Sequence, residues 1–486
     1  MTTTLARLVG PDVALATGVG SLAVSGLTAD SREVQPGYLF AALPGTLVDG
    51  AKFITQAFER GACAAIAGTG AYRGSGIVIE TANPHQLFAR AAARFFGKQP
   101  DLTVAVTGTN GKTSVASFVR EIWQAMGFRA ASLGTVGLVA PDAHKYLAHT
   151  TPDPVQLHSM LAELSENHVE HLALEASSHG LAQYRLDGVR FSAAAFTNLT
   201  RDHLDYHKSV DDYFDAKMRL FEELLPTGAP AVINADTSHG VEAIRRAEAR
   251  DLKVFSVGNS GTGLKLVSST RDGFGQQLVI QAPLKRHSVY LPLVGEFQTS
   301  NALVAAGLVI ATGGEETLVL HALESLHGAK GRLELVGKSK SGAPIFVDYA
   351  HTPDALENAI ASLRPYTDGK LVVVFGAGGD RDKGKRPLMG AAAARHADIK
   401  IVTDDNPRTE DAAAIRAEVM ATCPDAREIA DRAMAILTAV EGLAAGDVLL
   451  VAGKGHEEGQ TIGKTVVPFS DHEAVRAAIR GEAYHG

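Results

Sequence analysis

Short runs of apolar residues alternate with longer amphipathic segments along most of this chain. One set of runs covers residues 102–106, 171–175, 192–197 and 231–234, and a second covers 344–347, 371–375, 399–402 and 448–451. Apolar runs of this length predict strands buried on both faces, and the segments between them predict crossover helices. The pattern therefore predicts two α/β domains with mostly parallel sheets.

Helical periodicity is clearest just after the first of these strands. Val115, Phe118, Val119, Ile122, Trp123 and Met126 recur at the spacing of one helix face. Before residue 100 the pattern is of short strands and turns, closed by a predicted helix over residues 86–96. The most apolar stretch, residues 302–312, is short for a membrane span and predicts a buried helix.

Length and composition favour a globular protein of several domains. A chain of 486 residues exceeds one compact core, and we divide it at 1–99, 100–330 and 331–486. Apolar residues make up 45% and the net charge is −8, which argues against a nucleic-acid partner and against a basic membrane-binding surface. Cys63 and Cys423 form no paired motif and residues 1–20 make a poor signal peptide, so we expect a cytoplasmic protein without membrane insertion. The sequence leaves the oligomeric state open, and we expect a monomer.

A glycine-rich segment joins the strand at 102–106 to the following helix. Backbone N–H groups in such a turn converge on phosphate, a lysine neutralises its charge, and a hydroxyl can bind magnesium. Val106 stands where the common phosphate loop has its first glycine, which disfavours kinases and GTPases and favours a ligase form of the loop. The predicted ATP-binding residues here are Gly108, Thr109, Asn110, Gly111, Lys112, Thr113 and Ser114.

Magnesium ligands are expected at the ends of the following strands. Glu175 ends the run at 171–175, and His203 follows the run at 192–197. Magnesium takes few protein ligands beside phosphate oxygens and water, so Thr113, Glu175 and His203 are a plausible set.

Lys217 occupies an unusual helical position. It lies four residues after Tyr213 and four before Phe221, so a helix places it on an apolar face. A lysine there either extends to solvent or is held with a lowered pKa. A neutral amine can react with carbon dioxide to give a carbamate, which is an anionic oxygen ligand. The pattern alone leaves both readings open.

Taken together, the loop and several later segments resemble the Mur ligase family, whose members add amino acids to the cytoplasmic peptidoglycan precursor. The matching segments are residues 107–113, 175–180, 202–205, 213–221, 331–334, 348–353 and 453–457, which follow in order through almost the whole chain. The resemblance implies a smaller α/β N-terminal domain that binds a UDP-sugar, a central parallel-sheet ATPase domain, and a Rossmann-like C-terminal domain that binds the amino acid. It also implies ATP and Mg²⁺ as cofactors.

Within the family, residues 30–32 and 36–40 resemble the members that add the third residue of the peptide. The string Asp405-Asn406-Pro407-Arg408 accompanies meso-diaminopimelate rather than lysine in that group. A guanidinium suits the carboxylate at the far end of that substrate. The resemblance thus implies a ligase that joins meso-diaminopimelate to UDP-N-acetylmuramoyl-L-alanyl-D-glutamate through an acyl phosphate.

The resemblance also assigns roles to individual residues. Lys112, Glu175, His203 and Lys217 are implied to be catalytic, with Lys217 carbamylated and bound to magnesium beside Thr113. Asn301, Arg332 and Asp348 are implied to bind ATP. The implied substrate contacts are Ser31, Thr46, His149, Thr150, Thr151, Ser177, Gln183, Arg185, Arg381, Asp405, Asn406, Pro407, Arg408, Gly453 and Glu457.

Thr46 and His149 depart from the residues frequent in the family, which makes their side-chain contacts doubtful. The alternatives are a lysine-adding relative, a ligase like folylpolyglutamate synthase, and a non-catalytic nucleotide-binding scaffold for cell-wall assembly. A motor or kinase with a common phosphate loop is disfavoured by Val106.

Overall fold

The computed structural model describes residues 2–45, 48–200, 202 and 206–484. Two compact units make up the chain. The first comprises Met1–Val267, Ile280–His287 and Ser300–Ala322, and the second comprises Ser268–Val279, Ser288–Thr299 and Leu323–Gly486. Each unit is described by itself.

A small four-stranded parallel sheet opens the first unit, in the order β3-β4-β5-β6. Asn83 caps the helix that follows, because its side chain accepts a hydrogen bond from the backbone N–H of Gln86. This helix confirms the one predicted over residues 86–96. The elements are β1 (Thr3–Thr4), α1 (Leu5–Val9), β2 (Ala23–Val24), β3 (Gly26–Thr28), β4 (Tyr38–Ala41), α2 (Ile54–Glu59), β5 (Ala64–Gly68), β6 (Val78–Thr81) and α3 (Pro84–Phe96).

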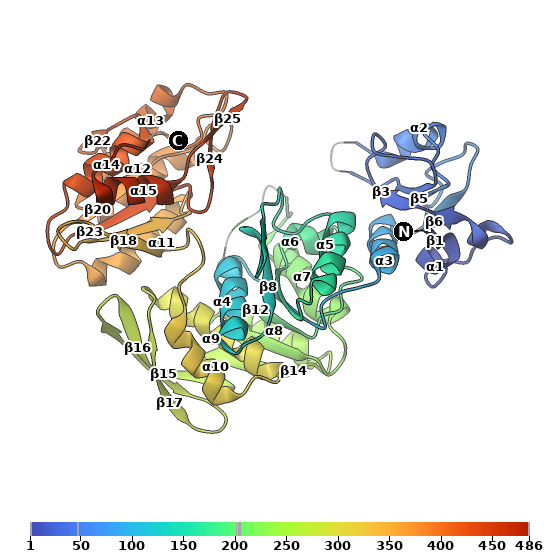
Figure 1. The fold of residues 1–486 in the computed structure, drawn as a ribbon, viewed down its shortest axis with the longest axis horizontal. Helices are drawn as coiled ribbons and strands as arrows, with labels where there is room; N and C mark the ends of the chain where they lie inside the picture. The colour runs from blue at the N-terminus through green and yellow to red at the C-terminus, as the bar shows by residue number, and fades with distance from the viewer. Residues whose placement is uncertain (1, 46–47, 201, 203–205, 485–486) are drawn as a thin grey trace. The chain divides into compact units, whose positions relative to one another are not determined.

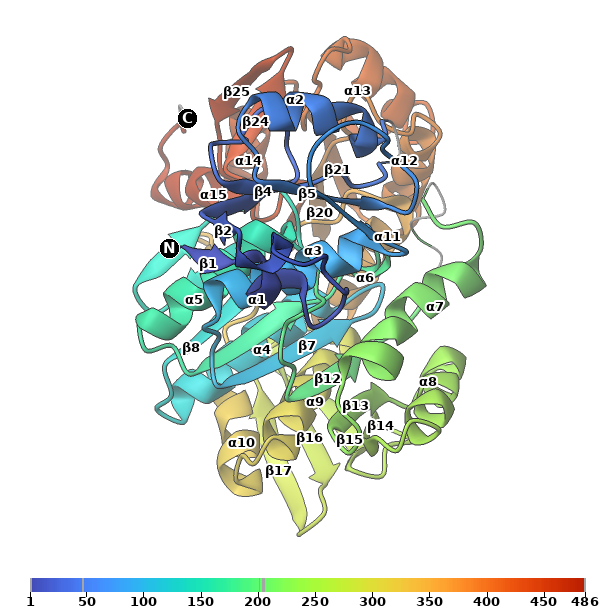
Figure 2. The ribbon, with the colours of Figure 1, turned by 90° about the vertical axis from the view of Figure 1, so that its right-hand side faces the viewer.

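The central sheet has the order β10-β9-β8-β11-β7-β12-β13-β14-β15-β16-β17, and Figure 2 shows β7, β12, β13 and β14 following one another across it. Strands β8, β11, β7, β12, β13 and β14 are mutually parallel. The strands are β7 (Leu102–Thr107), β8 (Ala130–Gly134), β9 (Gly137–Ala140), β10 (Ala143–Lys145), β11 (His171–Glu175), β12 (Ala193–Phe196), β13 (Pro230–Asn234), β14 (Lys253–Gly258), β15 (Leu264–Asp272), β16 (Gly275–Gln281) and β17 (Arg286–Leu291).

Helices cover this sheet, and α4 packs against β8, β11 and β7 (Figure 1). The apolar stretch near residue 302 lies within α9 as a buried helix, as predicted, and no helix among the described residues could cross a membrane. The helices are α4 (Lys112–Ala125), α5 (Pro154–Glu166), α6 (Ser178–Ala182), α7 (Val210–Arg219), α8 (Ser238–Glu248), α9 (Glu296–Ala311) and α10 (Glu316–Ala322). Residues Leu220–Leu224 continue α7 as one turn of π-helix.

The second unit contains a six-stranded sheet in the order β18-β19-β23-β20-β21-β22, parallel except for the β18–β19 pair. Its strands are β18 (Glu334–Lys338), β19 (Pro344–Asp348), β20 (Leu371–Phe375), β21 (Ile399–Val402), β22 (Arg427–Glu428) and β23 (Val448–Ala452), with a hairpin of β24 (Gly459–Ile462) and β25 (Thr465–Pro468). Its helices are α11 (Pro353–Leu363), α12 (Lys385–His396), α13 (Ala412–Met420), α14 (Arg432–Glu441) and α15 (Asp471–Arg480).

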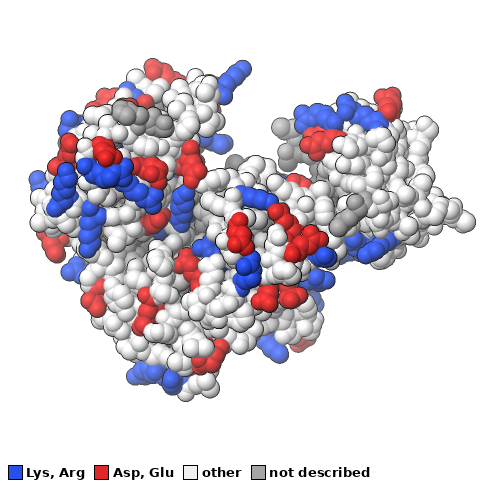
Figure 3. Space-filling view, in the orientation of Figure 1, with Lys and Arg blue, Asp and Glu red and all other residues white. Residues whose placement is uncertain are grey.

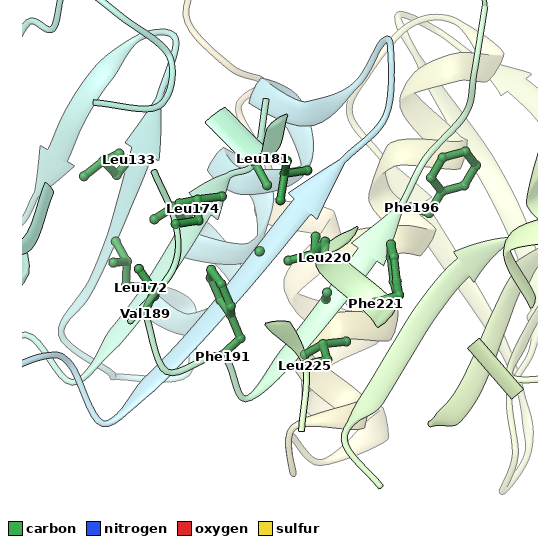
Figure 4. Packing of buried hydrophobic residues seen from close by; sticks show 14 of the residues in the cluster. Leu133, Leu172, Leu174, Leu181, Val189, Phe191, Phe196, Leu220, Phe221 and Leu225 are labelled. Carbon is green, nitrogen blue, oxygen red and sulfur yellow. The ribbon is translucent and has the colours of Figure 1, made fainter. Parts of the chain in front are cut away.

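A continuous apolar cluster fills one face of the central sheet. Figure 4 shows leucine and phenylalanine side chains from β8, β11 and β12, with Val189 and Phe191 from the segment before β12, meeting others from α6 and from the turn after α7. Because helices and loops cover these strands, β11 and β12 read as apolar runs that the sequence located, whereas the equally buried β8 was not predicted. On the face drawn in Figure 3, basic and acidic side chains are interspersed.

We expect Leu172→Ala to lower the free energy of unfolding by about 2–5 kcal/mol, because Leu172 is fully buried in β11 and the shorter side chain leaves a cavity. Urea denaturation can be followed through Trp123, the single tryptophan, which is buried on α4. Leu284→Ala is the control, since Leu284 is 80% exposed and its loss should change stability by less than about 0.5 kcal/mol. Equal effects of the two variants would contradict this picture of the core.

Candidate functional site

The glycine-rich turn between β7 and α4 has the backbone shape that glycine permits. Gly108 has φ 148° and Gly111 has φ 87°. A Cβ atom on Gly108 would lie 2.0 Å from the Thr197 hydroxyl, and one on Gly111 would lie 2.2 Å from Oδ1 of Asn301. Larger residues would therefore displace both neighbours, and Asn301, which is predicted to bind ATP, lies against the loop.

The end of β12 holds the turn in place. The backbone N–H of Thr109 donates to the carbonyl of Asn198 at 2.9 Å, and that of Asn110 donates to the Asn198 side chain at 3.0 Å. The Thr197 hydroxyl donates to the carbonyl of Asn110 at 2.7 Å. The loop is therefore fixed by a neighbouring strand end before any phosphate binds.

Two lysines converge on one carbonyl of this turn. Nζ of Lys112 donates to the carbonyl oxygens of Gly108 at 2.9 Å and of Thr109 at 2.7 Å, and Nζ of Lys217 donates to Gly108 at 2.8 Å. Lys217 is 1% exposed. Burial, and then repulsion by Lys112, hold the pKa of Lys217 well below its ordinary value, against an opposing effect of Asp202.

Tyr213 completes the surroundings of Lys217. Its ring lies 4.2 Å from Nζ of Lys217, and its hydroxyl donates to Oγ1 of Thr109 at 3.2 Å. Burial raises the pKa of Tyr213 to about 12, so this phenol stays neutral. The prediction that Lys217 shares the face of Tyr213 is confirmed, and its side chain does not extend to solvent.

Glu175 is the acidic group at the same strand edge. Its carboxylate accepts hydrogen bonds from the Thr113 hydroxyl at 3.2 Å, the Thr135 backbone N–H at 2.8 Å and the Thr135 hydroxyl at 3.1 Å. The oxygen atoms of the Glu175 carboxylate and of the threonine hydroxyls suit magnesium, which prefers hard oxygen ligands. Among the residues that the structure describes, no three His, Cys, Asp or Glu side chains form a metal-binding group, and the predicted ligand His203 lies outside them.

Four of the predicted substrate contacts form one hydrogen-bonded cluster. The Thr151 hydroxyl lies 2.9 Å from that of Ser177, and Arg185 donates to the carbonyl of Thr151 at 2.7 Å and to Oε1 of Gln183 at 2.7 Å. The Thr150 hydroxyl forms a hydrogen bond with the Thr135 hydroxyl at 3.0 Å.

Among the described residues, Ser31 and His149 form no hydrogen bond to this cluster. Ser31 donates to Oε1 of Gln56 at 2.9 Å, and His149 is exposed. Thr46 lies outside the described residues. Ser114 is buried in the first turn of α4.

Sequence reasoning missed a buried arginine beside this cluster. Arg219 donates to both carboxylate oxygens of Asp187, at 3.2 and 3.1 Å, and to the carbonyl of Leu181. Its guanidinium lies 3.9 Å from the ring of Tyr184, whose backbone is left-handed with φ 57°. Arg219 therefore ties α7, which carries the buried lysine, to the segment that carries Gln183.

In the second unit, Asp348 at the end of β19 accepts hydrogen bonds from the backbone of Leu333 at 2.6 Å and of Ala350 at 2.7 Å. Burial raises its pKa, and the nearby Arg332 opposes that shift. The guanidinium of Arg332 lies 4.8 Å from the ring of Tyr349. Arg332 and Asp348 thus adjoin each other, as expected of residues that serve one ligand.

The segment after β21 meets the end of β23. Asn406 donates to Oε2 of Glu457 at 2.9 Å, and Arg408 donates to the carbonyl of Gly379 at 2.7 Å. Gly453 follows β23 directly, next to the carboxylate of Asp405. Arg381 is exposed just after the 376–379 segment. The carboxyl ends of these parallel strands thus form one polar edge, where open α/β sheets bind ligands.

Comparisons with known proteins agree with this architecture. Family models match three parts of the chain: the Mur ligase family catalytic domain at residues 23–96, the Mur ligase middle domain at 106–309 and the Mur ligase glutamate ligase domain at 331–455. The parallel sheets within them confirm the predicted three-domain α/β fold.

Curated relatives match over nearly the full length. One from Bradyrhizobium diazoefficiens is 56% identical over 98% of this chain and 99% of its own, and one from Mesorhizobium japonicum is 54% identical over 96% and 97%. Both are named UDP-N-acetylmuramoyl-L-alanyl-D-glutamate–2,6-diaminopimelate ligase.

A solved structure of a protein with the same name is 32% identical, covers 99% of both chains and has a TM-score of 0.74. The fold also resembles folylpolyglutamate synthase of Mycobacterium tuberculosis complexed with ADP, at 21% identity and a TM-score of 0.60 over 75% of this chain and 91% of that one.

We expect Lys217 to form a carbamate with carbon dioxide. Only the neutral amine reacts, and a lowered pKa means that neutral amine is present below pH 10.5, increasingly as pH rises. Carbon-13 NMR of protein in labelled bicarbonate should show a carbamate resonance that grows with pH and is absent from Lys217→Met. The exposed Lys98 supplies the control, because Lys98→Met should keep the resonance. Identical spectra for wild type and Lys217→Met would refute the carbamate.

Proposed function

The chain belongs to the Mur ligase family, and on that premise we propose that it joins meso-diaminopimelate to UDP-N-acetylmuramoyl-L-alanyl-D-glutamate at the expense of ATP. The observation that carries this proposal is the near-complete match to ligases named for these two substrates, at more than half identity. Groups for that reaction are supplied by the glycine-rich turn, by the buried Lys217 and by the polar edge of the sheet in the second unit.

Amide formation from a carboxylate first requires a leaving group. Transfer of the γ-phosphoryl group of ATP to the γ-carboxylate of the D-glutamyl residue gives an acyl phosphate and ADP. The amine of diaminopimelate then attacks the acyl carbon, a tetrahedral intermediate forms, and phosphate departs with the electrons of the C–O bond as the amine loses a proton. Such a transfer depends mainly on positioning and electrostatics.

The first unit supplies the groups for phosphoryl transfer. Lys112, already directed at the phosphate turn, neutralises charge on the transferring group, and Asn301 stands beside the turn. When bound, Mg²⁺ would neutralise phosphate charge, held by Thr113, Glu175, His203 and the carbamate of Lys217. Thr150, Thr151, Ser177, Gln183, Arg185 and Ser31 are proposed to bind the UDP-linked peptide, with His149 and Thr46 contributing backbone groups.

The second unit supplies the groups for the incoming amino acid. The far end of diaminopimelate carries an ammonium and a carboxylate, and both kinds of partner stand at the edge described above. Arg408 and Arg381 are proposed to bind the carboxylate, because a guanidinium group can form bidentate hydrogen bonds with a carboxylate. Asp405 and Glu457 are proposed to bind the ammonium, with Asn406, Pro407 and Gly453 shaping the site. Arg332 and Asp348 are proposed to bind ATP.

Two readings compete with this one. A lysine-adding relative would not need Arg408, and the relatives reported above are named for diaminopimelate. The likeness to folylpolyglutamate synthase is of the fold alone. We further propose that the protein acts in the cytoplasm, as a monomer.

The decisive test offers the UDP-linked dipeptide and ATP with meso-diaminopimelate or L-lysine in separate reactions. Phosphate release should require the dipeptide and should be fast with meso-diaminopimelate only, because lysine leaves the groups for the far carboxylate unpaired. Phosphate release with lysine but not with meso-diaminopimelate would overturn the proposed specificity. The absence of phosphate release with either amino acid would overturn the proposed function.

Lys112→Met should lower kcat by about 100- to 1000-fold, the usual effect of removing one preorganised charged donor from a transition state. Phosphate release under saturating substrates measures it. Lys464→Met is the matched control because Lys464 is exposed in the second unit, and its kcat should equal that of the wild type. A Lys112→Met enzyme with full kcat would place phosphoryl transfer elsewhere.

A further inference from the structure

A fully buried lysine lies beside Asp405, Asn406 and Glu457 in the second unit. Lys454 follows β23, and its side chain is 0% exposed. Its Nζ contacts three groups: Oδ1 of Asn406 at 3.0 Å, Oε2 of Glu457 at 3.1 Å and Oδ1 of Asp405 at 3.7 Å. Burying an ammonium group away from water strongly destabilises a protein unless the group is paired. Here two carboxylates and one amide oxygen surround the ammonium group.

These contacts determine which way the Asn406 amide faces. Oδ1 of Asn406 accepts from Lys454 and also from the backbone N–H of Thr461 at 2.9 Å. Both partners can only donate, so the oxygen must face them, and the amide nitrogen must face Glu457. Lys454 thereby orients a side chain of the segment that recognises the amino acid.

The same lysine is the cation in direct contact with the acidic groups here. Its Nζ lies 3.1 Å from Oε2 of Glu457 and 3.7 Å from Oδ1 of Asp405, while the buried Arg432 acts on both carboxylates through space. Oδ1 of Asp405 is buried, accepts no hydrogen bond from the residues that the structure describes, and lies 3.7 Å from Nζ of Lys454. Arg408, held by the carbonyl of Gly379, stands in the same segment for a carboxylate.

We propose that Lys454 is a positioning residue that makes this site selective for an amino acid whose far end is zwitterionic over one whose far end is only cationic. The proposal rests on the function proposed above. Without Lys454, Asp405 and Glu457 would lose the cation that contacts them directly, and the Asn406 amide could turn over. That arrangement favours a bare ammonium and disfavours the accompanying carboxylate.

A neighbouring buried cation has its hydrogen bonds elsewhere. Arg432 and Asp471 have side chains that are both 0% exposed and lie 2.7 Å apart, and Arg432 also donates to the carbonyl of Ala452 at 2.9 Å. Arg432 thus supports the end of β23 and acts on Asp405 and Glu457 through space, but among the described residues it donates no hydrogen bond to Asn406 or Glu457. Its loss should reduce stability and all substrate affinities together.

The test compares KM and kcat for each substrate in Lys454→Met, a change that keeps the length of the side chain and removes its charge. KM for meso-diaminopimelate should rise about 10- to 100-fold, the scale of a lost hydrogen bond to a charged group, whereas KM for ATP and for the UDP-linked dipeptide should change less than about twofold. The preference for diaminopimelate over lysine, as a ratio of kcat/KM values, should fall at least about fivefold. Lys464→Met should match the wild type.

Lys454→Arg separates charge from geometry and serves if the methionine variant fails to fold, which thermal unfolding will show. Lys454→Arg should raise KM for diaminopimelate, because a planar guanidinium cannot reproduce the three contacts. It should keep most of the preference for diaminopimelate over lysine, because the positive charge is retained. An unchanged KM for diaminopimelate, a parallel rise in all three KM values, or an unchanged preference in Lys454→Met would each overturn the proposal. A wild-type enzyme that does not use diaminopimelate would instead overturn the proposed function.

Discussion

The carbonyl oxygen of Gly108 accepts hydrogen bonds from two lysines, and the chemistry of the first unit depends on that convergence. Lys112 comes from the helix directly after the turn, whereas Lys217 comes from a helix more than a hundred residues later. Burial, and then repulsion by Lys112, hold the pKa of Lys217 well below its ordinary value. The arrangement therefore favours the neutral amine of Lys217 and assigns different work to two residues of the same type.

Other buried cations are paired within the protein. The first unit pairs Arg219 with Asp187, and the second unit pairs Arg432 with Asp471 and Lys454 with Glu457. Paired ions in a protein interior are often no more stabilising than apolar residues of the same size. The pairs at the ends of β21 and β23 are better explained by orientation, because each fixes a backbone carbonyl or side-chain amide at the edge proposed to bind the amino acid.

Much of the fold could be predicted from the sequence, because most central strands are buried on both faces and read as unbroken apolar runs. Strands β11, β20 and β21 lie within the predicted bounds, and β7 and β23 each extend one residue further. No strand was predicted between residues 264 and 291, where β15 is mostly exposed and so carries little apolar signal. The face of Lys217 was predictable from its spacing to Tyr213, since helical periodicity is local.

What the sequence could not reveal are the partners of charged residues that are distant along the chain. Arg219 meets Asp187 across 32 residues and Lys454 meets Asn406 across 48, and no periodic pattern encodes such a pair. The motif at 405–408 predicts a recognition segment, and the orientation of its amide depends on a lysine outside the motif. The proposed substrate preference therefore has two levels: the 405–408 loop supplies the contacting groups, and the buried Lys454 sets their direction. Changing only the loop would leave the second level in place, so exchanging the loop between enzymes should transfer specificity incompletely.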